Sequence, residues 1–263
     1  ISTKNWKLYE HQIKMFTNSE CSAQLLIAPT GSGKTLAGFL PTIADLYLNP
    51  SPTLHTLYIS PLKALASDIK RNLEAPISEL KLSITVEDRT GDTKQSLKKK
   101  QRVIPPNILL TTTESLALLM SYPEAPRIFS TLKRIVVDEL HAITESKRGD
   151  QLFLAISNIR KYCRNVKIIG LSATVNDPSL IAGWLAPEYD CDIILSDPGL
   201  DPDVSILETS EPPPWAGSGG LYSIPEVINE IEKHKTTLIF HNTRAQAEIF
   251  FHNLWLANSK NLP

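Results

Sequence analysis

A glycine-rich stretch near the start of the chain carries the residue types of a phosphate-binding loop. The stretch reads Ala28-Pro29-Thr30-Gly31-Ser32-Gly33-Lys34-Thr35 and follows a short apolar run. Gly31 and Gly33 would let backbone N–H groups surround phosphate oxygens, and the start of a following helix would add positive potential. Lys34, which we expect to be exposed at the start of that helix, would reach the β- and γ-phosphates of ATP, and Thr35 would ligate Mg²⁺. The loop is therefore predicted to bind ATP, although its first position is Ala28 rather than glycine.

Two adjacent acids supply a second set of groups suited to chemistry. Asp138 and Glu139 follow the apolar run 134–137 and precede Leu140 and His141. A buried parallel strand that ends in acids delivers carboxylates to the edge where α/β proteins bind ligands. Asp138 suits the coordination of Mg²⁺, and Glu139 suits the base that activates an attacking water. Two solvated acids at a strand end are the alternative, but a phosphate-binding loop upstream favours a catalytic pair because each motif needs the other.

Apolar runs that alternate with amphipathic stretches predict the elements that position these residues. Predicted strands cover residues 25–28, 56–60, 107–111, 134–138 and 167–171, and predicted helices cover residues 34–48, 62–80 and 149–162. Strands that alternate with helices predict an α/β fold with a parallel sheet covered on both faces. In that fold the glycine-rich loop joins the first of these strands to the first of these helices, which is the context that a P-loop requires.

The last quarter of the chain has a different character. Residues 198–220 contain a high density of prolines and glycines, which is typical of a connector. Beyond it, the pattern predicts helices at 224–233 and 245–257 with a strand at 237–240 between them. One strand with two helices cannot bury a core of its own. We therefore expect a first domain over residues 1–197, a connector over 198–220, and the incomplete beginning of a second domain over 221–263.

Composition limits the class of protein. The chain has 263 residues, of which 42% are hydrophobic, and its formal net charge is −1. Global basicity therefore gives no sign of nucleic acid, and any such interaction must depend on local sites. The three cysteines, Cys21, Cys163 and Cys191, are scattered and form neither a metal-ligand pair nor a disulfide framework. No apolar run is long enough to span a bilayer, and we expect a cytoplasmic protein.

Several phrases, taken together and in order, resemble the DExH-box helicases of superfamily 2. Within that group the chain is similar to the Lhr-like helicases, and most of all to the ligase-associated DNA damage response DExH-box helicases. The phrases beyond the glycine-rich loop are Tyr58-Ile59-Ser60-Pro61-Leu62-Lys63-Ala64-Leu65, Arg89-Thr90-Gly91-Asp92-Thr93, Asp138-Glu139-Leu140-His141-Ala142, Ser146-Lys147-Arg148-Gly149-Asp150, Gly170-Leu171-Ser172-Ala173-Thr174-Val175 and Asn242-Thr243-Arg244-Ala245-Gln246-Ala247-Glu248. The resemblance covers almost the whole chain. It implies a RecA-like P-loop domain followed by the truncated start of a second RecA-like domain.

The resemblance also implies roles for individual residues. Gln12 is placed where such helicases read adenine. The residues with an implied coupling role between hydrolysis and motion are His141, Ser172 and Thr174. The residues implied to hold a sugar-phosphate backbone are Lys63, Thr90, Gly91, Thr112 and Arg244. Hydroxyls, backbone N–H groups and a lysine suit phosphate contacts that read no sequence, although the same residues are also ordinary helix caps.

Three departures from the family pattern stand out. Thr113 occupies the position of a proline, and the opening segment 5–12 lacks the usual glycine and proline-phenylalanine pair. The family also continues past Arg244 through an arginine-bearing motif that completes the ATP site, and that motif is not among these residues. We therefore expect the chain to be the front part of a longer motor.

The resemblance implies an ATP- and Mg²⁺-dependent helicase or translocase. Its partner would be single-stranded or partially duplex DNA, with a link to DNA repair and a repair ligase or nuclease as a further partner. One alternative is a truncated nucleotide-dependent binding module without efficient turnover. Others are an RNA helicase of a neighbouring DExH branch and a duplex translocase of the restriction or remodelling kind.

Overall fold

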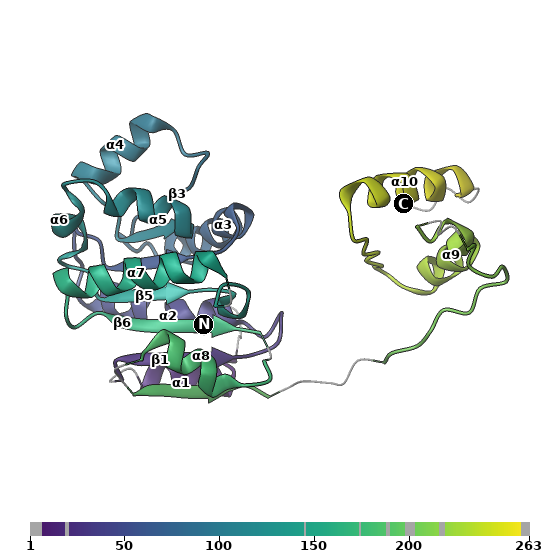
Figure 1. Ribbon diagram of the computed structural model, residues 1–263. Coiled ribbons are helices and arrows are strands. Elements are labelled where there is room, and N and C mark those ends of the chain that lie inside the picture. Colours follow the sequence, from purple (N-terminus) through teal and green to yellow (C-terminus); the bar gives the residue numbers. More distant parts are fainter. Residues whose placement is uncertain are drawn as a thin grey trace. The chain divides into compact units, whose positions relative to one another are not determined.

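The computed structural model describes residues 7–18, 21–144, 146–173, 175–187, 190–197, 203–215 and 219–258 (Figure 1). The chain divides into two compact units, Ile1–Leu200 and Asp201–Pro263. Within the described segments, no helix combines the length and apolarity needed to cross a membrane.

The first unit is built around one seven-stranded sheet in which every pairing is parallel. Its strands are β1 (Ala23–Ile27), β2 (Thr56–Ile59), β3 (Val86–Arg89), β4 (Ile108–Thr111), β5 (Arg134–Val137), β6 (Lys167–Ser172) and β7 (Cys191–Leu195). The strand order is β3-β4-β2-β5-β6-β1-β7. The predicted α/β fold with a parallel sheet is therefore confirmed.

Helices cover both faces of this sheet (Figure 1). They are α1 (Glu10–Thr17), α2 (Lys34–Leu48), α3 (Lys63–Glu79), α4 (Gln95–Val103), α5 (Thr113–Met120), α6 (Ala125–Phe129), α7 (Lys147–Tyr162) and α8 (Pro178–Leu185), with a short 3₁₀ turn at Leu140–Ala142. Neighbouring residues of one strand enter opposite cores, because side chains alternate across a sheet. Leu25 joins the core under α5, α6, α7 and α8, whereas Leu26 joins the core under α2 and α3.

The sequence patterns missed two strands, and both lie at the edges of the sheet. In β3 three of the four residues are charged, so no apolar run marks the strand. Its charges are paired from neighbouring elements. Lys70 Nζ lies 3.0 Å from Asp88 Oδ1, and Arg89 donates to the Lys98 carbonyl at 2.9 Å. At the other edge β7 is half-exposed over most of its length. An edge strand has a neighbouring strand on one side only and is more exposed to solvent, so it needs fewer apolar residues.

The second unit contains α9 (Ile224–Lys233) and α10 (Arg244–Ala257), which agree with the predicted helices to within one residue. The predicted strand at 237–240 is wrong, because those residues have no regular structure. A strand needs a hydrogen-bonded neighbour, and the described part of this unit contains no other strand. Leu238 and Phe240 are consequently exposed, while Phe250 is buried with its ring 4.8 Å from that of His241.

A buried histidine directly before β2 makes the stability of the first unit sensitive to acid. His55 hydrogen-bonds to the Thr56 hydroxyl at 2.9 Å, and burial lowers its pKa from 6.5 to about 4. Folding thus favours the neutral ring, and the stability it contributes is complete above pH 6.5 and lost as pH falls toward 4. We expect the melting temperature to fall over that window, and a His55→Gln variant to show a flatter profile. An identical pH profile in both proteins would contradict this role.

Candidate functional site

The glycine-rich loop has the backbone shape that its sequence predicts. Gly31 and Gly33 adopt φ values of +82° and +77°, a region that residues with a side chain rarely occupy. Gly33 is also the residue directly before α2, so the loop delivers its N–H groups to a helix N-terminus. A Cβ atom at Gly33 would lie 2.5 Å from Gln12 Nε2. The backbone conformation therefore favours glycine at Gly33, and a larger residue there would also displace the end of the Gln12 side chain.

Lys34 lies inside the loop rather than at its surface. Its residue is only 7% exposed, and Nζ donates to the Ala28 carbonyl at 2.8 Å. We expected an exposed lysine at this helix start, and that expectation is wrong. The side chain folds back over the loop, because a carbonyl there gives the ammonium a hydrogen-bond partner. Thr35 is half-buried next to it, and Thr30 and Gly31 remain exposed.

The helix α1 packs against this loop through two neighbouring side chains. Gln12 Oε1 accepts from the Tyr9 N–H at 3.0 Å, and Gln12 Nε2 donates to the Gly33 carbonyl at 3.2 Å. His11 Nε2 donates to the Ser32 carbonyl at 3.1 Å, and burial lowers the pKa of His11. The Tyr9 and His11 rings stack with centroids 5.4 Å apart. The sequence did not show that Gln12 and His11 both hold the loop.

Asp138 and Glu139 lie just beyond the end of β5, at the carboxyl edge of the sheet. Asp138 is 6% exposed, and both of its oxygens are engaged. Oδ1 accepts from the Glu139 N–H at 2.8 Å, and Oδ2 accepts from the Tyr58 hydroxyl. Glu139 has φ 48° and ψ 43°, a left-handed conformation that costs a residue with a side chain about 1–3 kcal/mol. Such strain is characteristic of residues that the surrounding structure holds for function.

Tyr58 is a site residue that the sequence patterns did not identify. It is fully buried in β2, and its ring stacks on Phe39 of α2 with centroids 5.3 Å apart. The register pairs Tyr58 with Val136, two residues before Asp138, so both side chains point to the same face. Burial and the adjacent Asp138 carboxylate raise the Tyr58 pKa far above its ordinary value, so the hydroxyl remains a donor. A tyrosine between the apolar residues Leu57 and Ile59 was the available signal.

Ser172, at the end of β6, connects the two motifs. Its carbonyl accepts from the Ala28 N–H at 3.1 Å, and its hydroxyl lies 3.2 Å from His141 Nδ1. His141 Nδ1 also accepts from the Ala173 N–H at 3.2 Å, so the neutral ring carries its proton on Nε2. That nitrogen lies 3.5 Å from Glu139 Oε2. Two of the three predicted coupling residues thus form a chain from Glu139 to the loop, and Thr174 lies outside the described residues.

Four of the five predicted strand-binding residues gather at the same edge. Lys63 Nζ lies 2.9 Å from Asp92 Oδ1 and would lie 2.9 Å from a Cβ atom at Gly91. Thr90 and Thr112 are both buried, and the Thr112 hydroxyl caps α5 by accepting from the Ser115 N–H. Arg244 belongs to the other unit, where it is exposed and pairs with Glu248 at 2.9 Å.

Thr113 occupies the first position of α5, where a proline would also fit. The change from the family pattern therefore leaves the helix start intact. The buried hydroxyl of Thr113 has no hydrogen-bond partner among the described residues.

The donor set at the edge suits Mg²⁺ bound with phosphates. Magnesium prefers oxygen ligands and is usually held by one or two carboxylates together with substrate phosphates. Thr35 offers a hydroxyl and Asp138 a carboxylate. Within the described segments, no cluster of three or more His, Cys, Asp or Glu side chains could hold a metal ion by itself. Thr35 and Asp138 therefore fit a metal that arrives with a nucleotide.

Comparison with known proteins agrees with this geometry. The chain is 37% identical over 249 residues to the ATP-dependent helicase Lhr-Core protein 2 of Thermococcus barophilus, covering 85% of this chain and 29% of that protein. It is 36% identical over 246 residues to the Lhr helicase/probable uracil glycosylase of Mycolicibacterium smegmatis, covering 88% of this chain and 16% of that protein. The chain thus spans less than a third of the length of these curated relatives.

Solved structures give the same result. The structure of Mycobacterium smegmatis helicase Lhr bound to ssDNA and AMP-PNP matches with a TM-score of 0.82 and 30% identity, over 98% of this chain and 35% of that one. The DUF1998 helicase MrfA bound to DNA and AMPPNP matches with a TM-score of 0.80 and 25% identity, over 99% of this chain and 37% of that one. The pattern that defines the DEAD/DEAH box helicases matches residues 9–181. The chain belongs to the DEAD/DEAH box helicases, and its similarity is to their Lhr-like members.

Proposed function

We propose that this chain binds ATP with Mg²⁺ at the carboxyl edge of its sheet and forms the front part of a DNA-directed helicase or translocase. The observation that carries the proposal is the connection through Ser172. One residue contacts the phosphate-binding loop by its carbonyl and the His141–Glu139 pair by its hydroxyl. Loss of a phosphate from the loop would thereby be transmitted to Asp138 and Glu139 at the end of β5.

Each residue at the edge has a distinct part in this proposal. Lys34 exchanges the Ala28 carbonyl for the β- and γ-phosphates, and the loop from Thr30 to Thr35 supplies N–H groups. Thr35 and Asp138 would hold Mg²⁺, which neutralises charge on the phosphates when bound. Glu139 takes the proton of the attacking water. Gln12 donates toward adenine while its carbonyl oxygen stays bound to the Tyr9 N–H.

The domain organisation is part of the same proposal. Residues 1–197 would form the first RecA-like domain, 198–220 the connector and 221–263 the beginning of the second. The division of the chain into Ile1–Leu200 and Asp201–Pro263 supports a boundary near these positions. Arg244, which starts α10, would grip the strand from the second domain.

We propose DNA as the substrate and DNA repair as the setting, in the cytoplasm. Two similar helicases have been solved with DNA bound, which supports DNA over RNA. A repair ligase or nuclease would be the further partner. Strand displacement by the full-length protein on matched DNA and RNA duplexes tests the substrate. Faster displacement of the RNA duplex would favour the neighbouring RNA branch instead.

Tyr58→Phe tests whether the hydroxyl on Asp138 orients the proposed metal ligand. Phenylalanine retains the ring that stacks on Phe39 and removes only the donor. A hydrogen bond to a charged group contributes about 1.5–3 kcal/mol, so we expect the Mg²⁺ concentration needed for ATP binding to rise about tenfold. ATP binding without metal should not change. Titration of a fluorescent ATP analogue over a range of Mg²⁺ concentrations measures both. An unchanged Mg²⁺ requirement would mean that Asp138 is held by its other contacts alone.

Strand binding at the edge is expected to be weak, sequence-tolerant and only slightly dependent on salt. Lys63 is the cation among the four predicted contacts of the first unit, and Asp92 already pairs with it. Each neutralised phosphate of a single strand changes the logarithm of affinity by about 0.7 per tenfold change in salt. Fluorescence anisotropy with labelled oligonucleotides should therefore show that Lys63→Ala lowers the salt slope by about one phosphate, equally for scrambled sequences. A salt slope that Lys63→Ala leaves unchanged would contradict this interface.

A further inference from the structure

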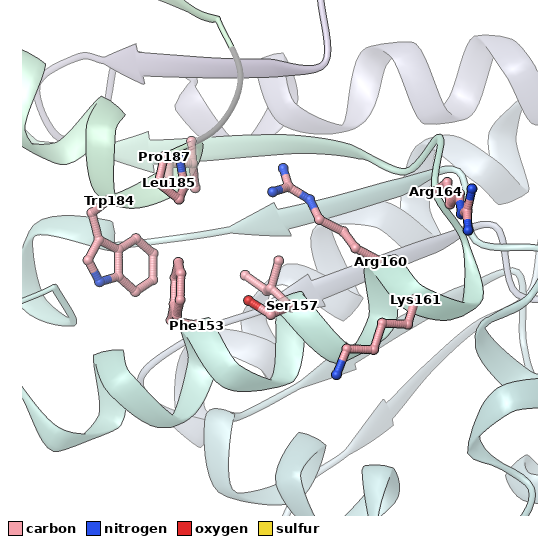
Figure 2. A pocket seen from close by; sticks show the side chains of 9 residues that line it. Phe153, Ser157, Arg160, Lys161, Arg164, Trp184, Leu185 and Pro187 are labelled. Atoms are coloured by element: carbon pink, nitrogen blue, oxygen red, sulfur yellow. The ribbon is translucent and has the colours of Figure 1, made fainter.

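A pocket of about 440 Å³ lies between α7 and α8, on the face of the sheet that these helices cover (Figure 2). Its lining residues are Phe153, Ile156, Ser157, Arg160, Lys161, Arg164, Trp184, Leu185 and Pro187. The helix α7 starts soon after the acids at the carboxyl edge and ends at Tyr162, five residues before β6 begins. The pocket therefore lies toward the amino edge of the sheet, away from the proposed nucleotide site.

One end of the pocket is aromatic with an apolar floor. The rings of Phe153 and Trp184 are 6.2 Å apart between centroids and inclined at 56°. Figure 2 shows the two rings side by side at this end. Ile156 and Leu185 are 5% and 3% exposed and belong to the core beneath. Phe153 is 37% exposed, so part of its ring remains available to a ligand.

The other end is cationic. Arg160, Lys161 and Arg164 line it, and the nine lining residues include no acid. Lys161 donates to the neutral Asn158 amide oxygen at 2.9 Å, so its charge has not been neutralised by that contact. Arg160 and Lys161 lie in the last turn of α7 and Arg164 in the turn after it, whereas the chain as a whole has a net charge of −1. This concentration of positive charge suits an anionic ligand.

Two classes of macromolecule present apolar and anionic groups together, namely an acidic peptide and a single nucleic-acid strand. An extended peptide gains affinity from main-chain hydrogen bonds to a strand edge, but the walls of this pocket come from α7 and α8 and offer no strand edge. A nucleic-acid strand needs only a ring face for a base and cations for its phosphates. Arg160 lies in the last turn of α7 and Arg164 in the turn that follows the helix, and both line the same pocket, so they can serve successive phosphates.

We propose that this pocket binds a second segment of single-stranded nucleic acid. A base would lie against Phe153 and Trp184, and the following phosphates would bind Arg160, Lys161 and Arg164. The volume is within the range of sites for ligands the size of a nucleotide. That the ligand is a nucleic-acid strand rests on the proposed function. That an anionic ligand binds in this pocket does not. The motor would then hold a strand at two separate places on the first unit.

Photo-crosslinking tests this proposal with the 263-residue chain. The probe is a thymidine dodecamer in which one position carries 5-iodouracil, irradiated with the protein and mapped by peptide mass spectrometry. We expect adducts on Phe153 or Trp184, in addition to any at the edge near Lys63. Reversing two exposed charges in Lys161→Glu/Arg164→Glu should lower the yield of the pocket adduct about tenfold, because two phosphate contacts become repulsive.

Two matched variants separate charge from folding. Lys99→Glu/Lys235→Glu makes the same change of charge at exposed positions outside the pocket and should retain the adduct. The conservative Lys161→Arg/Arg164→Lys should also retain it. Adducts at the edge without any in the pocket would overturn this proposal and leave the proposed function standing. Occupation of the pocket by an acidic tryptophan-containing peptide in preference to the oligonucleotide would likewise overturn it.

Discussion

Glu139→Gln is expected to slow ATP hydrolysis by about 10²- to 10⁴-fold, which is the usual cost of removing a general base. Glutamine has the shape of glutamate but cannot take a proton from the attacking water. The structure holds Glu139 in a left-handed backbone conformation with its carboxylate 3.5 Å from His141 Nε2. Because the Glu139 carboxylate is not needed to bind the phosphates or the metal, affinity for ATP and Mg²⁺ should be retained.

Steady-state hydrolysis by the full-length protein, with single-stranded DNA present, measures this effect. Glu74→Gln on the exposed side of α3 removes the same charge away from the edge and serves as the control. Binding of an ATP analogue to both variants shows that the site remains formed. Hydrolysis by Glu139→Gln at the rate of the control would remove Glu139 from the mechanism.

Lys34→Ala is expected to weaken ATP binding by about 10- to 100-fold. A hydrogen bond to a charged partner contributes about 1.5–3 kcal/mol, and each 1.4 kcal/mol is a factor of ten in affinity. Nζ can reach phosphates because it already lies within the loop, 2.8 Å from the Ala28 carbonyl. The loss of that bond should change the free energy of unfolding without nucleotide by only about 1 kcal/mol, since alanine favours the helix and the burial of a charge is relieved.

Titration calorimetry with a non-hydrolysable ATP analogue measures the affinity, and thermal unfolding without ligand measures the stability. Lys99→Ala, at an exposed position on α4, is the control for loss of a positive charge. Equal affinity of Lys34→Ala and this control would place the phosphates elsewhere.

The sequence predicted the central part of the fold well, because that part depends on strong local signals. The strands that lie inside the sheet are mostly apolar, and α2 has the bounds that were expected of it. The edge strand β3 was missed because three of its four residues are charged and their partners, such as Lys70 and Gln101, lie far along the chain. The false strand at 237–240 shows the converse, because an apolar run forms a strand only when another strand lies beside it.

The candidate site divides in a similar way. The glycine-rich loop and the Asp138-Glu139 pair are contiguous, so their residues could be named from the sequence alone. Tyr58 acts on Asp138 across two strands, and His11 acts on the loop from another helix. These contacts depend on strand register and helix packing, which no local pattern records. The burial of Lys34 was mispredicted for a different reason, because the shape of the loop lets its side chain fold back onto a carbonyl six residues earlier.

The most direct test of the account is whether the loop and Asp138 form one metal–nucleotide site. The measurement is the affinity of the 263-residue chain for a fluorescent ATP analogue, with and without Mg²⁺, in the wild type and in Asp138→Asn. The account predicts that Mg²⁺ strengthens binding to the wild type and has little effect on Asp138→Asn, while the two proteins bind the metal-free analogue equally. An affinity of the wild type that does not change with Mg²⁺, or an equal effect of Mg²⁺ on the affinity of Asp138→Asn, would contradict it.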